Sequence, residues 1–532
     1  MNRYDAIVVG GGHNGLVCGA YLAKADRRVV VLENRERVGG ATDTSRPWPE
    51  LPECRVSTYS YVVSLMSPGV VADLELERHG YRVVPQGPDY QPYPDGGALV
   101  IDSDDPEATH ASIGRFSKRD ADRYVEYRAW LDGVARAIWP LFTQVPPRLG
   151  SLRPGDLLDL VRTAWKLRGL GVRGVADVTQ LFAMSATDFL ARWFESEQLR
   201  GMLASDAVIG AWSGPDDPGS AYVLLHHCIG DAGGSTARWG YVVGGMGGIA
   251  EACRRSAEAH GGEVRTGARV ASIRVHDGRA SGVVLATGEE ISAPVVVSAV
   301  HPKIAFLELL DRGDLPDDFV HDIECWQSRS GVVKINLALS GLPDFRFQPG
   351  SQLQRHHTGT LLVAHSTDYM QRAFDDARAG RPAQCPYSEG VILTASDPSL
   401  APDGTHIASL FTQYVPKEWA AEPRREELEA YADRVVDAYT DLAPNFRDSI
   451  IARQVLSAYD MERDIGLVGG NIFHGDPSLD QIFHMRPAPG YADYTTPIRG
   501  LFHASSATHG GGGVTGIPGW QAARKALRYR AR

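Results

Sequence analysis

Three closely spaced glycines stand near the start of the chain. Gly10, Gly12 and Gly15 fit the pattern G-x-G-x-x-G, with His13 and Asn14 between the last two. In such a loop the first glycine permits a tight turn, the second lets the backbone approach a pyrophosphate, and the third lets the next helix pack closely. The free N–H groups at the start of that helix stabilise phosphate charge. The pattern therefore predicts a dinucleotide site, with all five residues near the cofactor.

An acidic residue and a second glycine group follow at once. Glu33 ends the next apolar segment, with Asn34 beside it, and a carboxylate there accepts hydrogen bonds from ribose hydroxyls and repels a 2′-phosphate. NADP is therefore disfavoured. Residues 37–44 fit R-x-G-G-x-x-x-[ST], a signature that resembles one found in two-dinucleotide-binding-domain flavoproteins, so FAD is favoured over NAD. The contacts expected in this segment are Arg37, near the adenosine end, and Gly39, Gly40, Ala41 and Thr42.

The end of the chain carries another glycine run. A short strand at 501–504 leads to His509 and to the glycines 510–513, and a helix is expected over 518–527. A helix start there would stabilise negative charge on a reduced flavin; the alternative is a flexible tail. His509 is the first candidate to accept a proton, because its segment should lie against the flavin. The cofactor contacts expected here are Ser505, Gly513, Val514 and Thr515.

These residues need a sheet and helices to position them. Residues 4–9 read as a buried parallel strand, and a helix over 16–26 and a strand over 27–33 follow. Residues 244–250 loosely fit G-x-G-x-x-A, so a second nucleotide site is an alternative there. Residues 263–300, however, alternate with period two around two glycine turns and predict a β-meander. This favours the second half of a flavin domain over a separate NADPH domain.

Longer strings carry a family resemblance. They lie at 10–16, 39–44, 241–252, 396–416, 469–487 and 508–519. On them the chain resembles the phytoene desaturase-related flavoproteins over nearly its whole length, and most resembles the branch called pyridine nucleotide-disulphide oxidoreductase domain-containing protein 2. The resemblance implies an α/β fold: a Rossmann-type FAD-binding domain of the glutathione reductase and amine oxidase kind, with an inserted α+β substrate domain. It also implies that the backbone of Val270 contacts the adenine.

The domain organisation follows from this interpretation. The FAD-binding domain is expected to combine 1–75, 240–310 and 496–532, and the substrate domain to combine 76–239 and 311–495. Small molecules bind by default at such domain junctions.

Other candidate catalytic residues lie in the middle of the chain. His474, Arg486 and Tyr241 are expected to line the substrate cavity. The histidine pairs at 226–227 and 356–357 lack a third ligand by spacing, so no metal is expected. No nucleophile signature of the G-x-S-x-G kind is present.

The leading hypothesis is an FAD-dependent desaturase or dehydrogenase. A hydride would pass from an apolar or long-chain substrate to flavin N5, and O2 or a quinone would reoxidise the flavin. The alternatives are a redox-neutral polyene cis-trans isomerase that uses reduced FAD, an amine oxidase, and a flavin-bearing interaction protein without turnover. The spacing of the motifs does not identify the substrate.

Composition limits the partners and the location. The 532 residues carry a net charge of −11, which disfavours nucleic acid, and 43% are hydrophobic, as in globular proteins. Six scattered cysteines and no long apolar run suggest a cytoplasmic protein without a transmembrane helix. Residues 148–173 form a basic segment with helical apolar spacing. It reads most simply as a surface helix, and peripheral membrane contact is the alternative.

Overall fold

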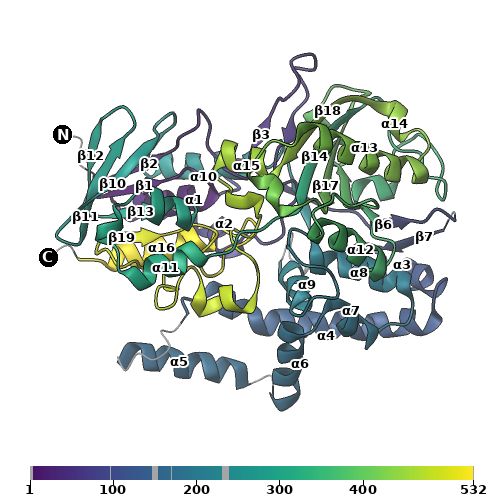
Figure 1. The fold of residues 1–532 in the computed structure, drawn as a ribbon, viewed down its shortest axis with the longest axis horizontal. Helices are drawn as coiled ribbons and strands as arrows, with labels where there is room; N and C mark the ends of the chain where they lie inside the picture. Colours follow the sequence, from purple (N-terminus) through teal and green to yellow (C-terminus); the bar gives the residue numbers. More distant parts are fainter. Residues whose placement is uncertain (1–3, 96, 147–153, 169–170, 231–238, 531–532) are drawn as a thin grey trace.

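The computed structural model describes residues 4–95, 97–146, 154–168, 171–230 and 239–530. Figure 1 shows two sheets on opposite sides of the molecule, each packed against its own helices. Within the described residues, no helix is both long and apolar enough to cross a membrane.

One sheet is parallel throughout and has five strands in the order β19-β13-β1-β2-β9. Its strands are β1 (Ala6–Val9), β2 (Val29–Leu32), β9 (Glu263–Arg265), β13 (Val296–Ser298) and β19 (Leu501–His503). Two strands come from the start of the chain, two from the middle and one from the end. Strands far apart in sequence therefore share one edge of the sheet, where their carboxyl ends lie together. The predicted Rossmann-type α/β domain is confirmed.

The two faces of this sheet are covered differently. Ala6 and Val8 pack in the cluster with α1 (His13–Lys24), α10 (Gly247–Ala259) and α16 (Ile517–Arg528). Ile7 and Val9 point the other way, as strand alternation requires, into the cluster formed with the next sheet and α11 (Asp317–Cys325). The parallel sheet is thus the middle layer of three.

The predicted meander is present. It consists of β10 (Val270–His276), β11 (Arg279–Leu285) and β12 (Glu290–Ser292), which pair antiparallel. The β10–β11 turn has positive φ at both Asp277 (51°) and Gly278 (68°), the conformation that favours Asp-Gly in tight hairpins.

The other large sheet has seven strands in the order β18-β14-β17-β16-β15-β6-β7. Its strands are β6 (Asp89–Pro92), β7 (Ala98–Ile101), β14 (Val332–Leu339), β15 (Thr360–Val363), β16 (Tyr387–Ile392), β17 (His406–Gln413) and β18 (Ile450–Ser457). All neighbours are antiparallel except β15 and β6. This is the α+β arrangement expected for the substrate domain.

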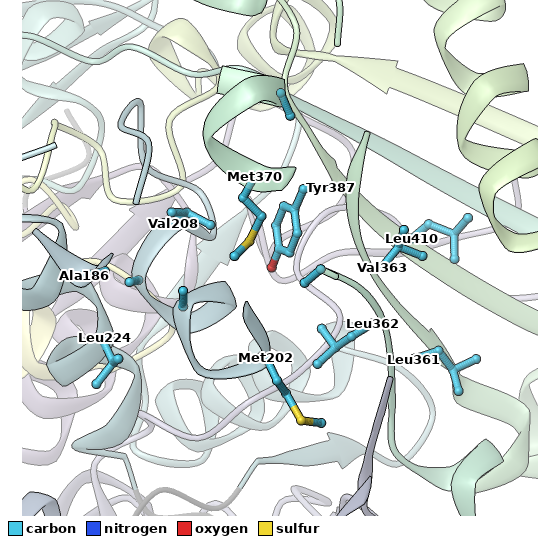
Figure 2. Close-up of a cluster of buried hydrophobic side chains, with 14 of the residues drawn as sticks. Ala186, Met202, Val208, Leu224, Leu361, Leu362, Val363, Met370, Tyr387 and Leu410 are labelled. Atoms are coloured by element: carbon cyan, nitrogen blue, oxygen red, sulfur yellow. The ribbon is translucent and has the colours of Figure 1, made fainter. Parts of the chain in front are cut away.

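Helices pack against this second sheet. Figure 2 shows strand residues such as Leu362 and Tyr387 facing Met202 of α8 and Met370 of α12 in one apolar cluster. The helices between the first strands and the meander are α2 (Pro68–Asp73), α3 (Pro106–Gly114), α4 (Lys118–Thr143), α5 (Pro154–Leu167), α6 (Gly171–Ala183), α7 (Ala186–Ala191), α8 (Glu197–Val208) and α9 (Ser220–Cys228). The later ones are α12 (Thr367–Arg378), α13 (Arg425–Leu442), α14 (Phe446–Ser449) and α15 (Ala458–Ile465). Two short pairs complete the description: β3 (Thr44–Ser45) with β4 (Val56–Ser57), and β5 (Val83–Pro85) with β8 (Gly240–Val242).

Candidate functional site

The first glycine loop lies between β1 and α1. Gly10 has φ +100°, and its N–H donates to the Leu32 carbonyl at 2.8 Å. A Cβ on Gly15 would lie 2.0 Å from the Gly10 carbonyl oxygen, so only glycine lets α1 approach the turn. A Cβ on Gly12 would meet nothing nearer than Gly39, at 4.0 Å. The space in front of the α1 N-terminus is therefore open, as a phosphate site there requires.

Glu33 lies beside this loop at the end of β2. Its buried carboxylate accepts hydrogen bonds from the Gly11 N–H at 2.8 Å and from the Arg35 N–H at 2.9 Å, one on each oxygen. These bonds fix the orientation of the carboxylate. Each oxygen keeps a second lone pair for a hydroxyl donor.

The segment before the meander passes Glu33. The Ala268 N–H donates to the Glu33 carbonyl at 2.7 Å, and the nearly buried Val270 follows two residues later at the start of β10. Val270 is thus placed near Glu33. Asn34 is exposed next to Glu33.

The second glycine pair lies against the first loop. The Gly39 N–H donates to the Gly11 carbonyl at 2.9 Å, and Gly39 and Gly40 have φ of +127° and +55°. The Thr42 hydroxyl donates to the Gly39 carbonyl at 2.8 Å. Ala41 lines the large cavity described below. The two glycine motifs, separated in sequence by β2, thus form one continuous backbone surface.

Arg37 is held by an ion pair. Its Nε and Nη2 donate to the two carboxylate oxygens of Asp43 at 2.7 and 3.0 Å, and Asp43 is buried. The hydrogen bond to Asp43 raises the pKa of Arg37. About half of the Arg37 side chain is exposed, so the guanidinium stays charged and within reach of a ligand.

The end of the chain meets its start at this place. The Asn14 amide nitrogen donates to the Ser506 hydroxyl at 3.0 Å. A Cβ on Gly519 would lie 2.1 Å from the Asn14 carbonyl oxygen, so α16 contacts α1 closely. The Thr515 hydroxyl donates to the Gly510 carbonyl at 3.0 Å and accepts from the Ile517 N–H at 3.1 Å, which closes the glycine run before α16.

The other residues expected here divide into two groups. Gly513 and Val514 line the cavity as expected, and so does Ser506, the neighbour of the predicted Ser505. Ser505 is buried instead, where its hydroxyl bonds His503 at 3.1 Å and accepts from the Ala507 N–H at 3.0 Å.

Buried polar atoms without partners surround these loops. Within the described residues, hydrogen-bond partners are missing for His13 Nε2, Asn14 Oδ1, Ser298 Oγ and His474 Nδ1. A buried polar atom without a partner costs about 1–3 kcal/mol. A ligand rich in phosphate, hydroxyl and ring nitrogen groups would satisfy such atoms. The orphaned atoms, the open α1 N-terminus and the fixed Glu33 carboxylate together fit FAD.

A large cavity joins these loops to the seven-stranded sheet. It comprises about 1730 Å³ of space free of protein atoms, including its opening. His13, Ala41 and Ser506 line one part, and Phe411 and Leu362 of the sheet line another. The cofactor loops and the substrate domain therefore face one shared space.

His509 is placed outside this cavity wall. Its Nε2 lies 2.7 Å from the Leu141 carbonyl oxygen, so it must carry the proton and donate it there. Burial lowers the pKa of His509 to about 4. His509 is not among the described residues that line the cavity. The structure gives it the role of joining the glycine run to α4.

His474 does line the cavity. Burial lowers its pKa to about 3, with the nearby His13 and Arg486 adding to the shift, so the ring is neutral. Arg486 is buried, donates to the Ser506 carbonyl at 3.2 Å and lies 5.5 Å from the Trp326 ring. Burial lowers the pKa of Arg486 to about 10. Arg486 thus positions the Ser506 segment from behind rather than from within the cavity.

Tyr241 also lies outside the cavity lining. It is buried in β8, and its hydroxyl donates to the Gly359 carbonyl at 3.3 Å. Burial raises its pKa well above the usual value. Tyr241 joins the segment before the meander to the second insertion and is not among the described residues that line the cavity.

The alternative nucleotide site at α10 is closed by side chains. The Gly247 N–H donates to the Thr44 hydroxyl at 2.9 Å, and the Met246 N–H donates to the Ser57 hydroxyl at 3.1 Å. A Cβ on Gly245 would lie 2.5 Å from Thr44. The glycines here admit β3 and β4, which occupy the position that a phosphate would need.

No metal site is formed by the described residues, among which no group of three His, Cys, Asp or Glu side chains is placed to hold an ion. His227 Nδ1 bonds the Asp206 carbonyl at 2.8 Å, and His357 Nε2 bonds the Pro343 carbonyl at 2.9 Å. One histidine of each pair is thus committed to the backbone.

The polar floor of the cavity was not predicted from the sequence. Lys334 of β14 and Glu389 of β16 both pair with Phe411 of the intervening β17. They therefore share one face of the sheet, about 9.6 Å apart at Cα. Tyr61 spans them: its ring lies 4.9 Å from the Lys334 nitrogen, and its hydroxyl donates to Glu389 at 2.8 Å. A lysine and an asparagine, Lys334 and Asn336, among the apolar residues of this strand were the available signal.

Lys334 is completely buried without a carboxylate partner among the described residues. It donates to Asn336 Oδ1 at 2.8 Å and to the Ser409 hydroxyl. The Asn336 amide nitrogen donates to the Thr58 carbonyl at 3.2 Å, which fixes the amide so that its oxygen faces Lys334. Burial lowers the pKa of Lys334 to about 7.

Three carboxyl groups and one guanidinium face the same cavity. They belong to Asp89, Asp206, Glu389 and Arg128. Burial raises the pKa of Asp89 to about 6, of Asp206 to about 7 and of Glu389 to about 8. Repulsion by Asp102 adds to the shift of Asp89, repulsion by Asp89 to that of Asp206, and repulsion by Asp206 and Asp89 to that of Glu389. Much of this acidic group is therefore protonated near neutral pH.

Two family models match the chain. A model described as NAD(P)-binding Rossmann-like domain matches residues 8–83. A model described as flavin-containing amine oxidoreductase matches residues 168–519, more than half of the chain.

Known proteins resemble the chain over nearly its full length. The rat pyridine nucleotide-disulfide oxidoreductase domain-containing protein 2 is 39% identical, covering 99% of this chain and 94% of the relative. A lycopene-forming phytoene desaturase from Pseudescherichia vulneris is 23% identical, covering 96% of each. The crystal structure of an oxidoreductase from Methanosarcina mazei shares the fold at 17% identity, with a TM-score of 0.61 and coverage of 98% and 99%.

Proposed function

Because the chain belongs to the flavin-containing amine oxidoreductase family and is an FAD-dependent oxidoreductase, we propose that it dehydrogenates a long, largely apolar substrate. The substrate would lose two hydrogens and gain a double bond. FAD, when bound, supplies the two-electron acceptor for such a reaction. Since the α10 N-terminus is closed by Thr44 and Ser57, we propose O2 or a quinone, rather than a nicotinamide, as the final electron acceptor.

The observation that carries this proposal is the single cavity between the cofactor loops and the sheet. Its apolar lining includes Leu65, Met202, Leu203, Leu362, Phe411, Met461, Leu467, Ile472 and Phe473. These side chains exclude water and hold a hydrocarbon chain by burial, at roughly 25 cal/mol per Å² of apolar surface. A substrate on this lining reaches the loops that carry His13 and Ser506.

The polar floor refines the substrate class. Glu389 accepts a hydrogen bond from Tyr61 at 2.8 Å and Asp89 accepts one from Gln86 at 3.3 Å, but a wholly hydrocarbon ligand would give the remaining acceptor positions of these carboxyl groups and of Asp206 no partner. We therefore propose an amphiphilic substrate, with a hydrocarbon part along the apolar lining and a polar group at the acidic residues. Asp206 and Glu389, whose pKa values burial raises to about 7 and 8, suit proton transfer near neutral pH.

One observation favours a second candidate, an amine oxidase. Asp89, whose pKa of about 6 leaves it mostly ionised at pH 7, faces the cavity and would attract an ammonium group. Release of an amine or ammonia together with hydrogen peroxide would select this candidate over desaturation.

The test uses the yellow holoprotein under anaerobic conditions. Matched compounds of equal chain length are added: a hydrocarbon terpenoid, a long-chain alcohol and a long-chain amine. We expect loss of the visible band of oxidised flavin with a polar-ended compound, and its return with O2 or a quinone. No bleaching with any class overturns the proposal. Turnover only in pre-reduced enzyme without an acceptor indicates an isomerase instead.

A further inference from the structure

Helix α5 carries its apolar side chains on the outside of the molecule. Trp165 is 65% exposed, and Val172 at the start of α6 is 91% exposed. A helix that covers a core has its apolar side chains on the side that faces the core. On α5 these apolar side chains face the solvent instead. The exposed apolar residues of this surface, which we call the α5 ridge, are Leu157, Leu158, Leu160, Val161, Trp165, Val172 and Val175.

The polar side of α5 faces the protein. The Thr163 hydroxyl accepts a hydrogen bond from the Gln144 amide, just after α4, at 3.1 Å, and Thr163 is partly buried. Successive helix residues are about 100° apart, so Val161 and Trp165, each two positions from Thr163, lie about 160° round from it. Leu157, Val161 and Trp165 follow at intervals of four and share the outer side. The direction of the ridge is thus fixed by a contact on the opposite side.

The charges on the ridge are basic in an acidic protein. Arg162, Arg168 and Arg173 are exposed on or beside it, with Arg173 3.6 Å from the carboxylate of Asp177, whereas the whole chain has a net charge of −11. The Arg168 guanidinium lies 3.3 Å from the centre of the Trp165 ring. Tryptophan and arginine side chains on an apolar helix are suited to the boundary between lipid acyl chains and headgroups.

We propose that the α5 ridge binds the surface of a membrane that contains anionic lipids. The apolar row enters the acyl boundary, and the arginines lie at the phosphate level. Figure 1 shows α5 at the rim of the molecule, apart from both sheets. A projecting helix with exposed apolar side chains fits a deformable lipid surface. The proposal does not depend on the reaction that the cavity performs.

The experiment measures binding of the holoprotein to vesicles. Vesicles of phosphatidylcholine alone are compared with vesicles containing phosphatidylglycerol, by co-sedimentation at two salt concentrations. We expect binding only to the anionic vesicles, and weaker binding in high salt. The variant Leu158→Gln/Val161→Gln/Trp165→Gln should bind at least tenfold more weakly, because three exposed apolar side chains are lost. Arg168→Gln/Arg173→Gln should lose about fivefold per charge.

A matched control removes exposed apolar side chains elsewhere. Leu353 and Leu479 are 57% and 58% exposed, and Leu353→Gln/Leu479→Gln should bind vesicles like the wild type. Flavin content and circular dichroism of all variants show that they fold. Equal vesicle binding by the ridge variant and the control overturns the proposal. So does a dimer in light scattering that the ridge variant abolishes without any vesicle binding by the wild type, since the ridge would then bind a second copy.

Discussion

The hydroxyl of Tyr61 donates a hydrogen bond to a carboxyl oxygen of Glu389, at 2.8 Å, in the cavity that the cofactor loops share with the substrate domain. Burial raises the pKa of Glu389 to about 8, and the Tyr61 hydrogen bond opposes that shift only in part. A segment close to the second glycine motif thereby touches the middle of the seven-stranded sheet. Substitutions at this junction should change how the stability of the protein depends on pH without changing its flavin content.

Glu389→Gln should make stability less sensitive to pH between about 4.5 and 8. The carboxyl has its usual pKa of 4.5 in the unfolded chain and about 8 in the folded protein. The folded state therefore binds more protons in this window, and wild-type stability falls as pH rises through it. Glutamine keeps an acceptor for Tyr61 without the charge. Thermal unfolding from pH 4.5 to 8.5 measures the difference, and parallel curves for the two proteins would contradict the assignment.

Lys334→Met should remove a pH dependence of stability that has the opposite sign to that of Glu389 and lies at higher pH. Burial lowers the pKa of Lys334 from 10.5 to about 7, so between these values the unfolded chain binds more protons and wild-type stability rises with pH. The slope has an upper bound of about 1.4 kcal/mol per pH unit, and methionine removes it. Urea unfolding at pH 7 and pH 9.5 checks this. Lys118→Met, at an exposed lysine, is the matched control and should leave the slope unchanged.

Gly12→Ala and Gly15→Ala should differ although they lie in one loop. The added carbon at Gly12 meets open space, so stability without cofactor should change by less than about 0.5 kcal/mol while flavin content falls. At Gly15 the same carbon lies 2.0 Å from the Gly10 carbonyl oxygen, and a loss of about 3 kcal/mol or more is expected. Urea unfolding and bound-flavin absorbance separate the two effects. Full flavin content in the Gly12 variant is the result that would remove Gly12 from the cofactor cradle.

His509→Gln should retain the rate of flavin reduction to within about threefold. The imidazole donates to the Leu141 carbonyl, and burial lowers its pKa to about 4, so it is neutral throughout the working range. Loss of a general base would instead lower the rate about 100-fold or more. The measurement uses whichever compound bleaches the flavin anaerobically. A hundredfold loss at unchanged flavin content would restore His509 as the proton acceptor.

The local motifs were predictable because each needs only neighbouring residues. The turn at Gly10, the tight packing at Gly15 and the Asp277-Gly278 hairpin follow from glycine geometry and short-range spacing. The parallel sheet was predictable because strand patterns stand on either side of such loops. The helix over 16–26 in fact begins earlier, at His13, because the glycine loop feeds directly into it.

The cavity floor could not be predicted in the same way. Lys334, Phe411 and Glu389 come together only through the pairing of three strands that are distant in sequence. The reversed side of α5 likewise depends on the Thr163 contact with Gln144, since an amphipathic pattern does not show which side faces the protein. His509 was assigned by its nearness to the glycine run, whereas its ring turns toward the Leu141 carbonyl.

The order of the strands in the parallel sheet has a consequence for how the protein folds during its synthesis. Its edge strand β19 and the helix α16, which packs on α1, are encoded after both insertions. On the ribosome, β1, β2 and α1 emerge first and must wait for nearly the whole polypeptide before their last neighbours arrive. During that interval the side of α1 that α16 covers in the folded protein stays exposed.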